Sequence, residues 1–269
     1  MGRPFTRVLA AAGLDVVGWN RSSLDAGLIE GIRVVSLEDA ARRDVVLMML
    51  SDSPATDQVL NELEPLLTPG QVVLDMGSSD PRRSAEHALR LAQTGVGWVD
   101  APVSGGPEGA AAGTLAIMAG GSETDVGRVR SILDALGGNV VHVGGAGAGH
   151  TTKLVNQLIC GLAIEAVGEG LTLAEKAGLD PALVQQALTG GFADSRVLQL
   201  HGTRMIARDY TPGGKARTHL KDLRMVQALA ADLDLTLPHT DDVAARYEQL
   251  VERGEGDLDH SALHKLLWD

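Results

Sequence analysis

The segment 147–157 carries a lysine and an amide at a spacing that suits catalysis on a helix. It reads Gly-Ala-Gly-His-Thr-Thr-Lys-Leu-Val-Asn-Gln, so Lys153 and Asn156 are three positions apart and project from one helical face. A lysine here could protonate a carbonyl oxygen as hydride arrives, or accept the alcohol proton in the reverse direction. The alternative is a solvated lysine, which is the common case for a single lysine on a helix.

A glycine-rich segment offers a second candidate site. The stretch 100–107 reads Asp-Ala-Pro-Val-Ser-Gly-Gly-Pro and follows a predicted strand. No large side chain shields the backbone amides of Ser104, Gly105 and Gly106. Such amides, together with a hydroxyl, can hold a carboxylate without a net cation. We therefore predict an anion site here, with a plain glycine-rich turn as the alternative.

The residues after an early apolar run indicate the choice of dinucleotide. Asn20, Arg21 and Ser22 follow the run 15–19, where the adenosine ribose lies in dinucleotide-binding folds. NAD-selective sites carry Asp or Glu there, whereas an arginine with a small hydroxyl residue suits a 2′-phosphate. The pattern favours NADP over NAD, with an ordinary polar turn as the alternative.

Other patterns that could carry chemistry are weaker. His260 and His264 have the i, i+4 spacing that can present two metal ligands on one face, and Asp257 is nearby. The Glu of a His-Glu-x-x-His site is missing, so we predict no metal and a solvated terminal helix. Ser104 does not belong to a Gly-x-Ser-x-Gly elbow, which argues against a hydrolase.

The elements that must position these residues alternate along the first half of the chain. Short β-branched runs separated by helical stretches are typical of an α/β domain with a parallel sheet. The strand candidates are 15–19, 45–50, 71–75, 97–100, 115–119 and 139–143, and the clearest helices between them are 53–67 and 81–93.

After Gly149 the strand signals stop, and the remainder is predicted to be helical, beginning with an apolar helix over 151–177. At 1.5 Å per residue that helix would extend about 40 Å, enough to leave one domain and start another. We therefore predict a Rossmann-type NADP-binding domain over 1–145. An all-helical domain over 146–269 would bind substrate and form a homodimer or homotetramer, because the apolar, glycine-containing helix needs a packing partner.

Composition excludes several classes of partner. A formal net charge of −12, without a clustered basic stretch, argues against nucleic acid. No run reaches the roughly 18 uninterrupted apolar residues that span a membrane, and the first residues lack a signal-peptide pattern. The single Cys160 excludes an intrachain disulfide and fits a reducing compartment. These observations predict a cytoplasmic protein that binds a small carboxylate-bearing substrate and no membrane.

The chain opens with Met-Gly-Arg-Pro and continues directly into helix-like sequence before the run 15–19. A dinucleotide-binding domain normally begins with a strand and a glycine-rich turn that holds the pyrophosphate. We therefore expect the first strand of the cofactor domain to be missing from the chain as written. Ladder hydrogen bonds should then be lost on both sides of its place in the sheet.

Taken together and in this order, these segments resemble the β-hydroxyacid dehydrogenase family. That family includes 3-hydroxyisobutyrate dehydrogenases, tartronate semialdehyde reductases and glyoxylate/succinic semialdehyde reductases. The resemblance spans nearly the whole chain and is most specific at 100–115, at 147–157 and at Lys221-Asp222-Leu223. It implies a nicotinamide-dependent oxidoreductase of a small hydroxy acid, in which Lys153 is the catalytic acid or base and Asn156 positions the substrate.

The resemblance also implies the remaining site residues. The substrate carboxylate is assigned to Ser104, Gly105 and Gly106, and Gln157 is placed at the substrate. The residues assigned to the cofactor, beside those after the run 15–19, are Leu50, Ser51, Ser78, Lys221 and the turn residues Met1 and Gly2.

Two positions depart from the family pattern. Gln157 stands where a second asparagine is usual, but it can still donate and accept hydrogen bonds; Gly214 stands where an aromatic residue often walls the substrate pocket. Two other functions stay open: a non-catalytic or cofactor-impaired homologue, and a reductase of imines or other carbonyl-like groups on the same scaffold. The presence of Lys153 argues against the imine reductase.

Overall fold

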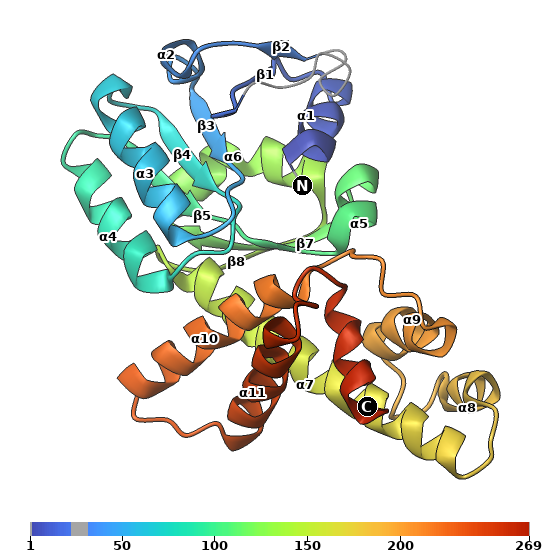
Figure 1. Cartoon of the computed structure of the whole chain (residues 1–269). Helices are drawn as coiled ribbons and strands as arrows, with labels where there is room; N and C mark the ends of the chain where they lie inside the picture. The colour runs from blue at the N-terminus through green and yellow to red at the C-terminus, as the bar shows by residue number, and fades with distance from the viewer. Residues whose placement is uncertain (1, 23–31, 269) are drawn as a thin grey trace. The chain divides into compact units, whose positions relative to one another are not determined.

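The computed structural model describes residues 2–22 and 32–268, which form two compact units, Met1–Lys153 and Leu154–Asp269. The first unit contains strands and helices and the second contains helices (Figure 1). Each unit has a hydrophobic core of its own. The long helix expected between two domains is present as α7 (Ala148–Lys176), and the division between the units falls within it.

A six-stranded sheet forms the centre of the first unit. Its strand order is β3-β4-β5-β7-β6, and β8 also pairs with β7. The strands are β3 (Val45–Met48), β4 (Val72–Asp75), β5 (Gly97–Asp100), β6 (Val103–Ser104), β7 (Leu115–Gly121) and β8 (Gly137–Gly144). The pairs β3–β4, β4–β5 and β7–β8 are parallel, as the β-branched runs predict.

The sheet is not parallel throughout, because β7 runs antiparallel to β5 and β6. Between β5 and β7 the chain forms β6 and the seven-residue helix α5 (Gly106–Ala112). Gly113, with φ of 66°, ends α5 and turns the chain into β7. β7 therefore runs back along β6 as its antiparallel partner. A crossover helix between the two strands would instead have made them parallel.

Strands β1 (Val17–Gly18) and β2 (Arg33–Val34) form a separate parallel pair. Only part of the predicted strand 15–19 is extended, and β2 was not predicted. Within the described residues, β1 pairs with β2 alone and β3 with β4 alone. The first unit therefore contains two sheets where a doubly wound fold has one.

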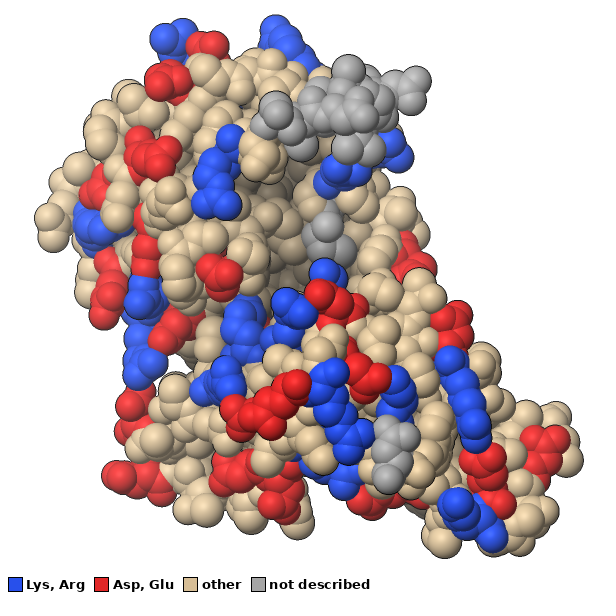
Figure 2. All heavy atoms as spheres, in the orientation of Figure 1, with Lys and Arg blue, Asp and Glu red and all other residues tan. Residues whose placement is uncertain are grey.

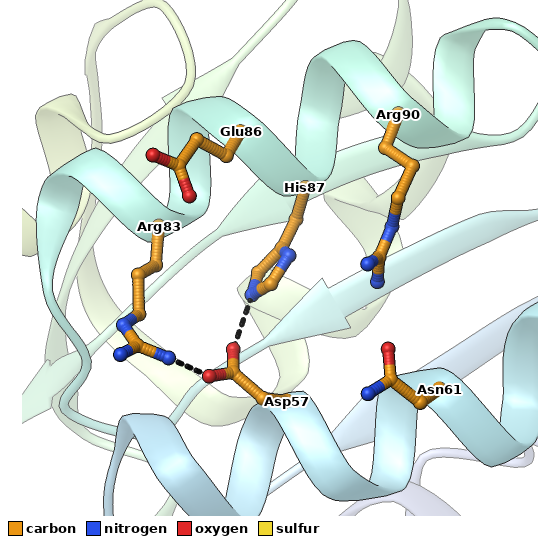
Figure 3. Close-up of a pocket in the computed structure, with 6 residues that line it drawn as sticks. All are labelled: Asp57, Asn61, Arg83, Glu86, His87 and Arg90. Carbon is orange, nitrogen blue, oxygen red and sulfur yellow. Dashed lines mark ion pairs between the residues drawn. The ribbon is translucent and has the colours of Figure 1, made fainter.

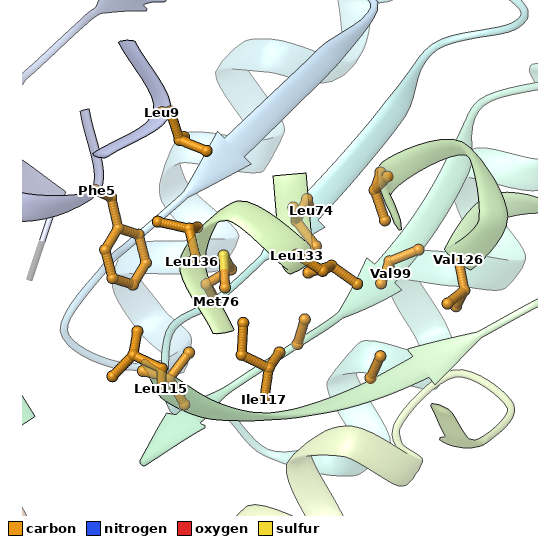
Figure 4. Packing of buried hydrophobic residues seen from close by; sticks show 14 of the residues in the cluster. Phe5, Leu9, Leu74, Met76, Val99, Leu115, Ile117, Val126, Leu133 and Leu136 are labelled. Carbon is orange, nitrogen blue, oxygen red and sulfur yellow. The ribbon is translucent and has the colours of Figure 1, made fainter. Parts of the chain in front are cut away.

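Helices cover both faces of the large sheet. They are α1 (Gly2–Ala11), α2 (Leu37–Ala40), α3 (Ser53–Leu63) with the turn η2 (Glu64–Leu66), α4 (Pro81–Ala92) and α6 (Glu123–Leu136). Successive residues of a strand point to opposite faces: Val72 and Leu74 pack with α1, α5 and α6, whereas Val73 packs with α3 and α4. Figure 4 shows the first of these cores, where Phe5 and Leu133 approach the strands from the helices.

The helices α3 and α4 begin at residues that favour helix starts. The side chains of Asp52 and Asp80 accept hydrogen bonds from the amides of Ala55 and Arg82, and a proline follows in the first turn of each helix. Both features satisfy or remove amides that would otherwise lack a partner.

The second unit is helical, as predicted. Its elements after α7 are α8 (Pro181–Leu188), η3 (Leu198–Gly202), α9 (Thr203–Ala207), α10 (Ala216–Asp232), α11 (Pro238–Glu252) and η4 (His260–Leu267). Its core includes Ile164 of α7, Leu223 of α10 and Tyr247 of α11, all nearly inaccessible to water. An antiparallel bridge between Lys215 and Asp259 ties the start of α10 to the start of η4.

Helix α7 is the most apolar long element of the described chain. By length and composition alone it could cross a membrane, and 28% of its most apolar window is buried within the chain. Val155, Ile159 and Leu173 on this helix are 52%, 59% and 72% exposed. The helix therefore presents an apolar face that the described residues do not cover.

Candidate active site

The start of α7 is held by a buried carboxylate. Asp100, the last residue of β5, is fully buried, and its Oδ1 accepts a hydrogen bond from the Gly147 amide at 2.7 Å. Its Oδ2 accepts another from the His150 amide at 2.8 Å. The first amides of a helix lack intrahelical partners, and negative charge is favourable beside them. Asp100 therefore fixes the first turn of the helix that carries Lys153.

A second acid and a histidine complete this buried cluster. His150 Nδ1 lies 2.6 Å from the Ser84 hydroxyl, and the ring nitrogens lie 3.8 Å from Asp100 Oδ2 and 3.9 Å from Asp75 Oδ2. Asp75, which ends β4, also accepts a hydrogen bond from the Gly77 amide at 2.9 Å. Burial raises the pKa of Asp100, while His150 and the backbone amides oppose that rise. Sequence analysis missed this cluster, whose one signal is that both acids end a strand.

Two glycines let α7 approach the sheet. A Cβ at Gly149 would lie within 3.0 Å of the carbonyl oxygens of both Asp100 and Met118. Gly147 has φ of 88°, and a Cβ there would lie 2.6 Å from the Pro81 carbonyl oxygen. The space beside both glycines is filled by the main chain of the protein. Their role is to dock the helix.

Lys153 lies one turn beyond His150 on α7, and it is only 9% exposed. Asn156 follows on the same helix; its Nδ2 donates to Gln157 Oε1 at 2.9 Å and lies 3.7 Å from Cys160 Sγ. Because α7 is continuous through these positions, the amine and the amide share one face of it, as the spacing predicts. A lysine amine and an amide on one helical face can exchange a proton with a substrate oxygen and orient that oxygen.

The helical unit joins the other implied residues to one carboxylate. Gln157 Nε2 donates to Asp222 Oδ2 at 2.6 Å, which links α7 to α10. Lys221 Nζ lies 3.2 Å from Asp222 Oδ1. The resemblance implies that Lys221 reaches the cofactor or the substrate. In this structure its amine pairs with the carboxylate of the adjacent Asp222. Asp222, only 2% exposed, thus orients two candidate site residues.

The predicted anion site is an exposed turn between β6 and α5. Ser104 ends β6, and Gly105 and Gly106 follow with φ of 136° and 67°. Residues with side chains rarely adopt these conformations, and a Cβ at Gly105 would also lie 3.0 Å from Leu115 Cδ2. The turn therefore requires glycine, and its uncovered amides suit a carboxylate.

The predicted cofactor residues of the first unit follow the carboxyl ends of its strands. Leu50 and Ser51 come after β3, and Ser78 comes after β4. Since β3 and β4 are parallel neighbours, these residues lie at one edge of the sheet, where doubly wound folds bind dinucleotides. A Cβ at Gly77 would lie 3.0 Å from the Leu50 carbonyl oxygen, so the two loops approach each other closely.

Three exposed polar residues follow β1. Asn20 Nδ2 donates to the Ser22 carbonyl oxygen at 2.9 Å, and Arg21 Nη1 donates to Gln58 Oε1 of α3 at 3.3 Å. A guanidinium has five donors, so further ones remain for a phosphate, and this set fits an adenine dinucleotide. Gly2 is the first residue of α1, and Met1 lies outside the described residues.

The expectation of a solvated terminal helix is wrong. His264 is 4% exposed, and its Nδ1 lies 3.2 Å from the Tyr210 hydroxyl. Asp257 pairs with Lys215 at 2.8 Å. A Cβ at Gly214 would lie 3.6 Å from the His260 ring, so this departure from the family pattern faces a histidine of the terminal segment. His264 and Asp257, two of the three residues weighed as metal ligands, therefore have separate partners.

A pocket between α3 and α4 lies apart from these residues (Figure 3). Its lining is Asp57, Asn61, Arg83, Glu86, His87 and Arg90. Asp57 pairs with Arg83, and His87 Nε2 lies 3.0 Å from the same carboxylate. Burial lowers the pKa of His87. These charged groups neutralise one another and join two helices, so we assign the pocket a structural role.

The chain matches two sequence families over nearly its whole length. Residues 1–144 match the NAD binding domain of 6-phosphogluconate dehydrogenase. Residues 147–267 match the family described as NAD-binding of NADP-dependent 3-hydroxyisobutyrate dehydrogenase.

Individual proteins agree with these matches. The chain is 40% identical to the 2-hydroxy-3-oxopropionate reductase of Escherichia coli K12, over 99% of this chain and 94% of that protein. The structure of 3-hydroxyisobutyrate dehydrogenase from Salmonella typhimurium is 28% identical with a TM-score of 0.88, covering 98% of this chain and 95% of that one. The Mycobacterium tuberculosis 3-hydroxyisobutyrate dehydrogenase with L-serine is 28% identical with a TM-score of 0.89, covering 99% and 95%. The chain therefore belongs to the β-hydroxyacid dehydrogenase family of nicotinamide-dependent oxidoreductases.

Proposed function

We propose that this chain reduces the carbonyl group of a three-carbon acid with NADPH, and that Lys153 supplies the proton. When bound, the cofactor supplies a hydride to the carbonyl carbon; with a proton on the oxygen, the products are a hydroxy acid and NADP⁺. The observation that carries the proposal is the position of Lys153, a residue only 9% exposed, one turn beyond the start of α7 that Asp100 and Gly149 hold against the sheet.

The substrate class is inferred from the relatives and from the anion site. The E. coli relative is named for 2-hydroxy-3-oxopropionate, and the M. tuberculosis structure contains L-serine. Both are three-carbon acids with an oxygen on C3, and such a molecule needs one anion site and one proton site. The turn at Ser104, Gly105 and Gly106 supplies the first. On the face shown in Figure 2, basic and acidic residues are interspersed, which suits a small molecule better than a nucleic acid.

The residues of α7 divide the work. In reduction, Lys153 Nζ donates its proton to the carbonyl oxygen and regains one from water; in oxidation it takes the hydroxyl proton. Asn156 hydrogen-bonds the substrate oxygen from the same helical face. Gln157 contacts the substrate with a side chain whose orientation Asp222 fixes.

We propose NADP rather than NAD as the cofactor, because Arg21 and Ser22 are exposed donors at the end of β1. A charge-assisted hydrogen bond to the 2′-phosphate is worth about 1.5–3 kcal/mol, or about ten- to a hundredfold. We expect kcat/KM with NADPH to exceed that with NADH by this factor, and Arg21→Ala to remove most of the preference. Arg43→Ala is the matched control, because Arg43 pairs with Asp15. Equal efficiency of the two dinucleotides in the unmodified protein would contradict the assignment.

We also propose that two copies associate through the helical unit. Leu173 of α7 and Leu183 of α8 are 72% and 63% exposed, and Phe192 is fully exposed. Burying a large apolar side chain is worth about 1.5–3 kcal/mol, and an apolar helix face can pair with its own copy across a twofold axis. Light scattering should give at least a dimer, and Phe192→Ser should weaken it. A concentration-independent monomer mass would remove this proposal.

A further inference from the structure

Three histidines from separate elements meet inside the helical unit. His260 Nε2 lies 3.2 Å from His201 Nε2, and His260 Nδ1 lies 3.2 Å from His219 Nδ1. The ring planes of both pairs are steeply inclined, at 83° and 64°, so the rings meet through their nitrogens and not by stacking. The Tyr247 hydroxyl donates to the His260 carbonyl oxygen at 3.0 Å and holds the central residue in place.

A buried aspartate anchors one end of these rings. Asp259 Oδ1 lies 3.5 Å from His201 Nδ1, and Oδ2 lies 3.1 Å from the Arg204 guanidinium. Oδ2 also accepts hydrogen bonds from the Gly213 and Gly214 amides at 2.9 and 3.2 Å. Burial favours the neutral acid, but the surrounding donors outweigh it and hold the pKa of Asp259 well below its ordinary value. Asp259 is therefore ionised and only accepts hydrogen bonds.

An ionised carboxylate at one end decides where each imidazole proton lies. His201 Nδ1 faces Asp259 Oδ1, and an imidazole with its single proton on Nδ1 has Nε2 as an acceptor. His260 must then donate from Nε2, which leaves its Nδ1 as an acceptor, and His219 must donate from Nδ1. We refer to Asp259, His201, His260 and His219, in this order, as the histidine row.

This arrangement requires a neutral ring at its centre. Burial lowers the pKa of His260 well below its ordinary value, and the Arg204 charge lowers it further while Asp259 opposes both. His260 is therefore neutral at physiological pH and can donate on one side while it accepts on the other.

The His219 end of the row lies beside the proposed substrate residues. His219 and Asp222 are three positions apart on α10 and are both 2% exposed. Gln157 and Gly161 are four apart on α7. Gln157 Nε2 donates to Asp222 Oδ2 at 2.6 Å, and a Cβ at Gly161 would lie 2.9 Å from His219 Nε2. These two contacts lie about one turn apart along α7 and α10. The position of the His219 ring therefore sets the distance between the two helices beside Asp222.

We propose that the histidine row positions a residue of the substrate site. By fixing His219 against Gly161, it maintains the hydrogen bond between Gln157 and Asp222. The inference rests on the proposed role of Gln157 at the substrate. The row moves no proton in the reaction; it sets the orientation of a side chain that does contact the substrate.

A divalent metal is the competing occupant of this cluster. His201, Asp259 and His260 offer ligand atoms within 4.8 Å of one another. However, Arg204 and backbone amides occupy Oδ2 of Asp259, and the Ser261 hydroxyl donates to Oδ1 at 2.6 Å. A cation would have to displace these donors and a guanidinium charge, which favours the hydrogen-bonded row.

The protonation pattern can be measured without any turnover. In protein labelled with ¹⁵N-histidine, nitrogen shifts should show the Nδ1–H tautomer at His201 and His219 and the Nε2–H tautomer at His260. One equivalent of zinc sulfate should leave these signals unchanged. An Nε2–H tautomer at His219 would overturn the row, and zinc-induced shifts at His201 and His260 would overturn it in favour of a metal site.

Two substitutions of His260 test its contacts with His201 and His219 one at a time. Glutamine reaches the position of Nε2 and keeps a donor for His201, whereas asparagine reaches the position of Nδ1 and keeps an acceptor for His219. We expect His260→Gln to raise the substrate KM about tenfold with little change in kcat, and His260→Asn to raise it less than about threefold.

Each variant loses one of the two ring contacts. If the row had a purely structural role, both variants would raise KM equally, and the change in KM would follow the loss of thermal stability. Equal KM shifts in His260→Gln and His260→Asn would overturn the positioning role. If the unmodified protein reduces no three-carbon carbonyl acid, the proposed function fails, while the tautomer measurement still decides whether the row exists.

Discussion

Gly149→Ala adds one methyl group where α7 meets the sheet. The new Cβ would lie within 3.0 Å of the main-chain carbonyl oxygens of Asp100 and Met118, and 2.9 Å from Asp100 Oδ2. Main-chain atoms of β5 and β7 cannot turn aside as a side chain can, so the start of the helix must move by roughly 1 Å to restore ordinary contact. Such overpacking costs about 1–3 kcal/mol, against about 0.5–1 kcal/mol gained from alanine in a helix. We expect a net loss of about 1–2 kcal/mol in the free energy of unfolding.

The same movement displaces Lys153, one turn further along α7, and a 1 Å misplacement at a reacting group can lower the rate about a hundredfold. Urea denaturation and steady-state kinetics, with NADPH binding followed by fluorescence, measure both effects. The control is Gly170→Ala on the same helix, where a Cβ meets nothing within 4 Å, so stability should rise by about 0.5–1 kcal/mol with kcat unchanged. If Gly149→Ala retained the stability and kcat of Gly170→Ala, the docking role of the glycine would be refuted.

Three further predictions concern other parts of the chain. Gly161→Ala should raise the substrate KM, because its Cβ would press on His219 Nε2 at 2.9 Å; an unchanged KM in a stable variant would contradict this. Burial lowers the pKa of His264 to about 4, below its unfolded value near 6.5, so the unfolded state binds the proton first. The free energy of unfolding should therefore fall by about 1–3 kcal/mol between pH 6.5 and 4, and His264→Gln should flatten that dependence in urea titrations. Ser104→Ala should raise KM for the acid with little change in kcat, and a loss confined to kcat would argue against a binding role.

Local patterns predicted the elements whose residues carry a clear period. The runs 45–50, 71–75 and 97–100 became β3, β4 and β5, and the apolar stretch 151–177 lies within α7 almost entirely. Strands β2 and β6 have two residues each, too few to show an alternation. The direction of β7 was not predictable either, because it depends on which strand the segment pairs with and not on its own side chains.

The motifs located Lys153, Asn156 and Ser104, and their roles stay predictions. What anchors them was not foreseen, because it joins residues far apart in the sequence: Asp100 to the amide of His150, and Gln157 to Asp222. A strand that ends in a buried acid is a usable signal for the first contact. The histidine row has no such signal, since its members come from three separate elements and meet only in the folded unit.

The most direct test of the proposed chemistry is single-turnover reduction of 2-hydroxy-3-oxopropionate by Lys153→Met, which keeps the apolar stem of the side chain and removes its proton. The rate of hydride transfer should fall by about 10²–10⁴, the usual contribution of a general acid, while the NADPH dissociation constant changes by less than about threefold. Lys221→Met, measured in parallel, tests whether Lys221, the other lysine in the family motifs, is the proton donor instead. A folded, NADPH-binding Lys153→Met protein that transfers hydride at the rate of the unmodified chain would contradict the assignment of Lys153 as the proton donor.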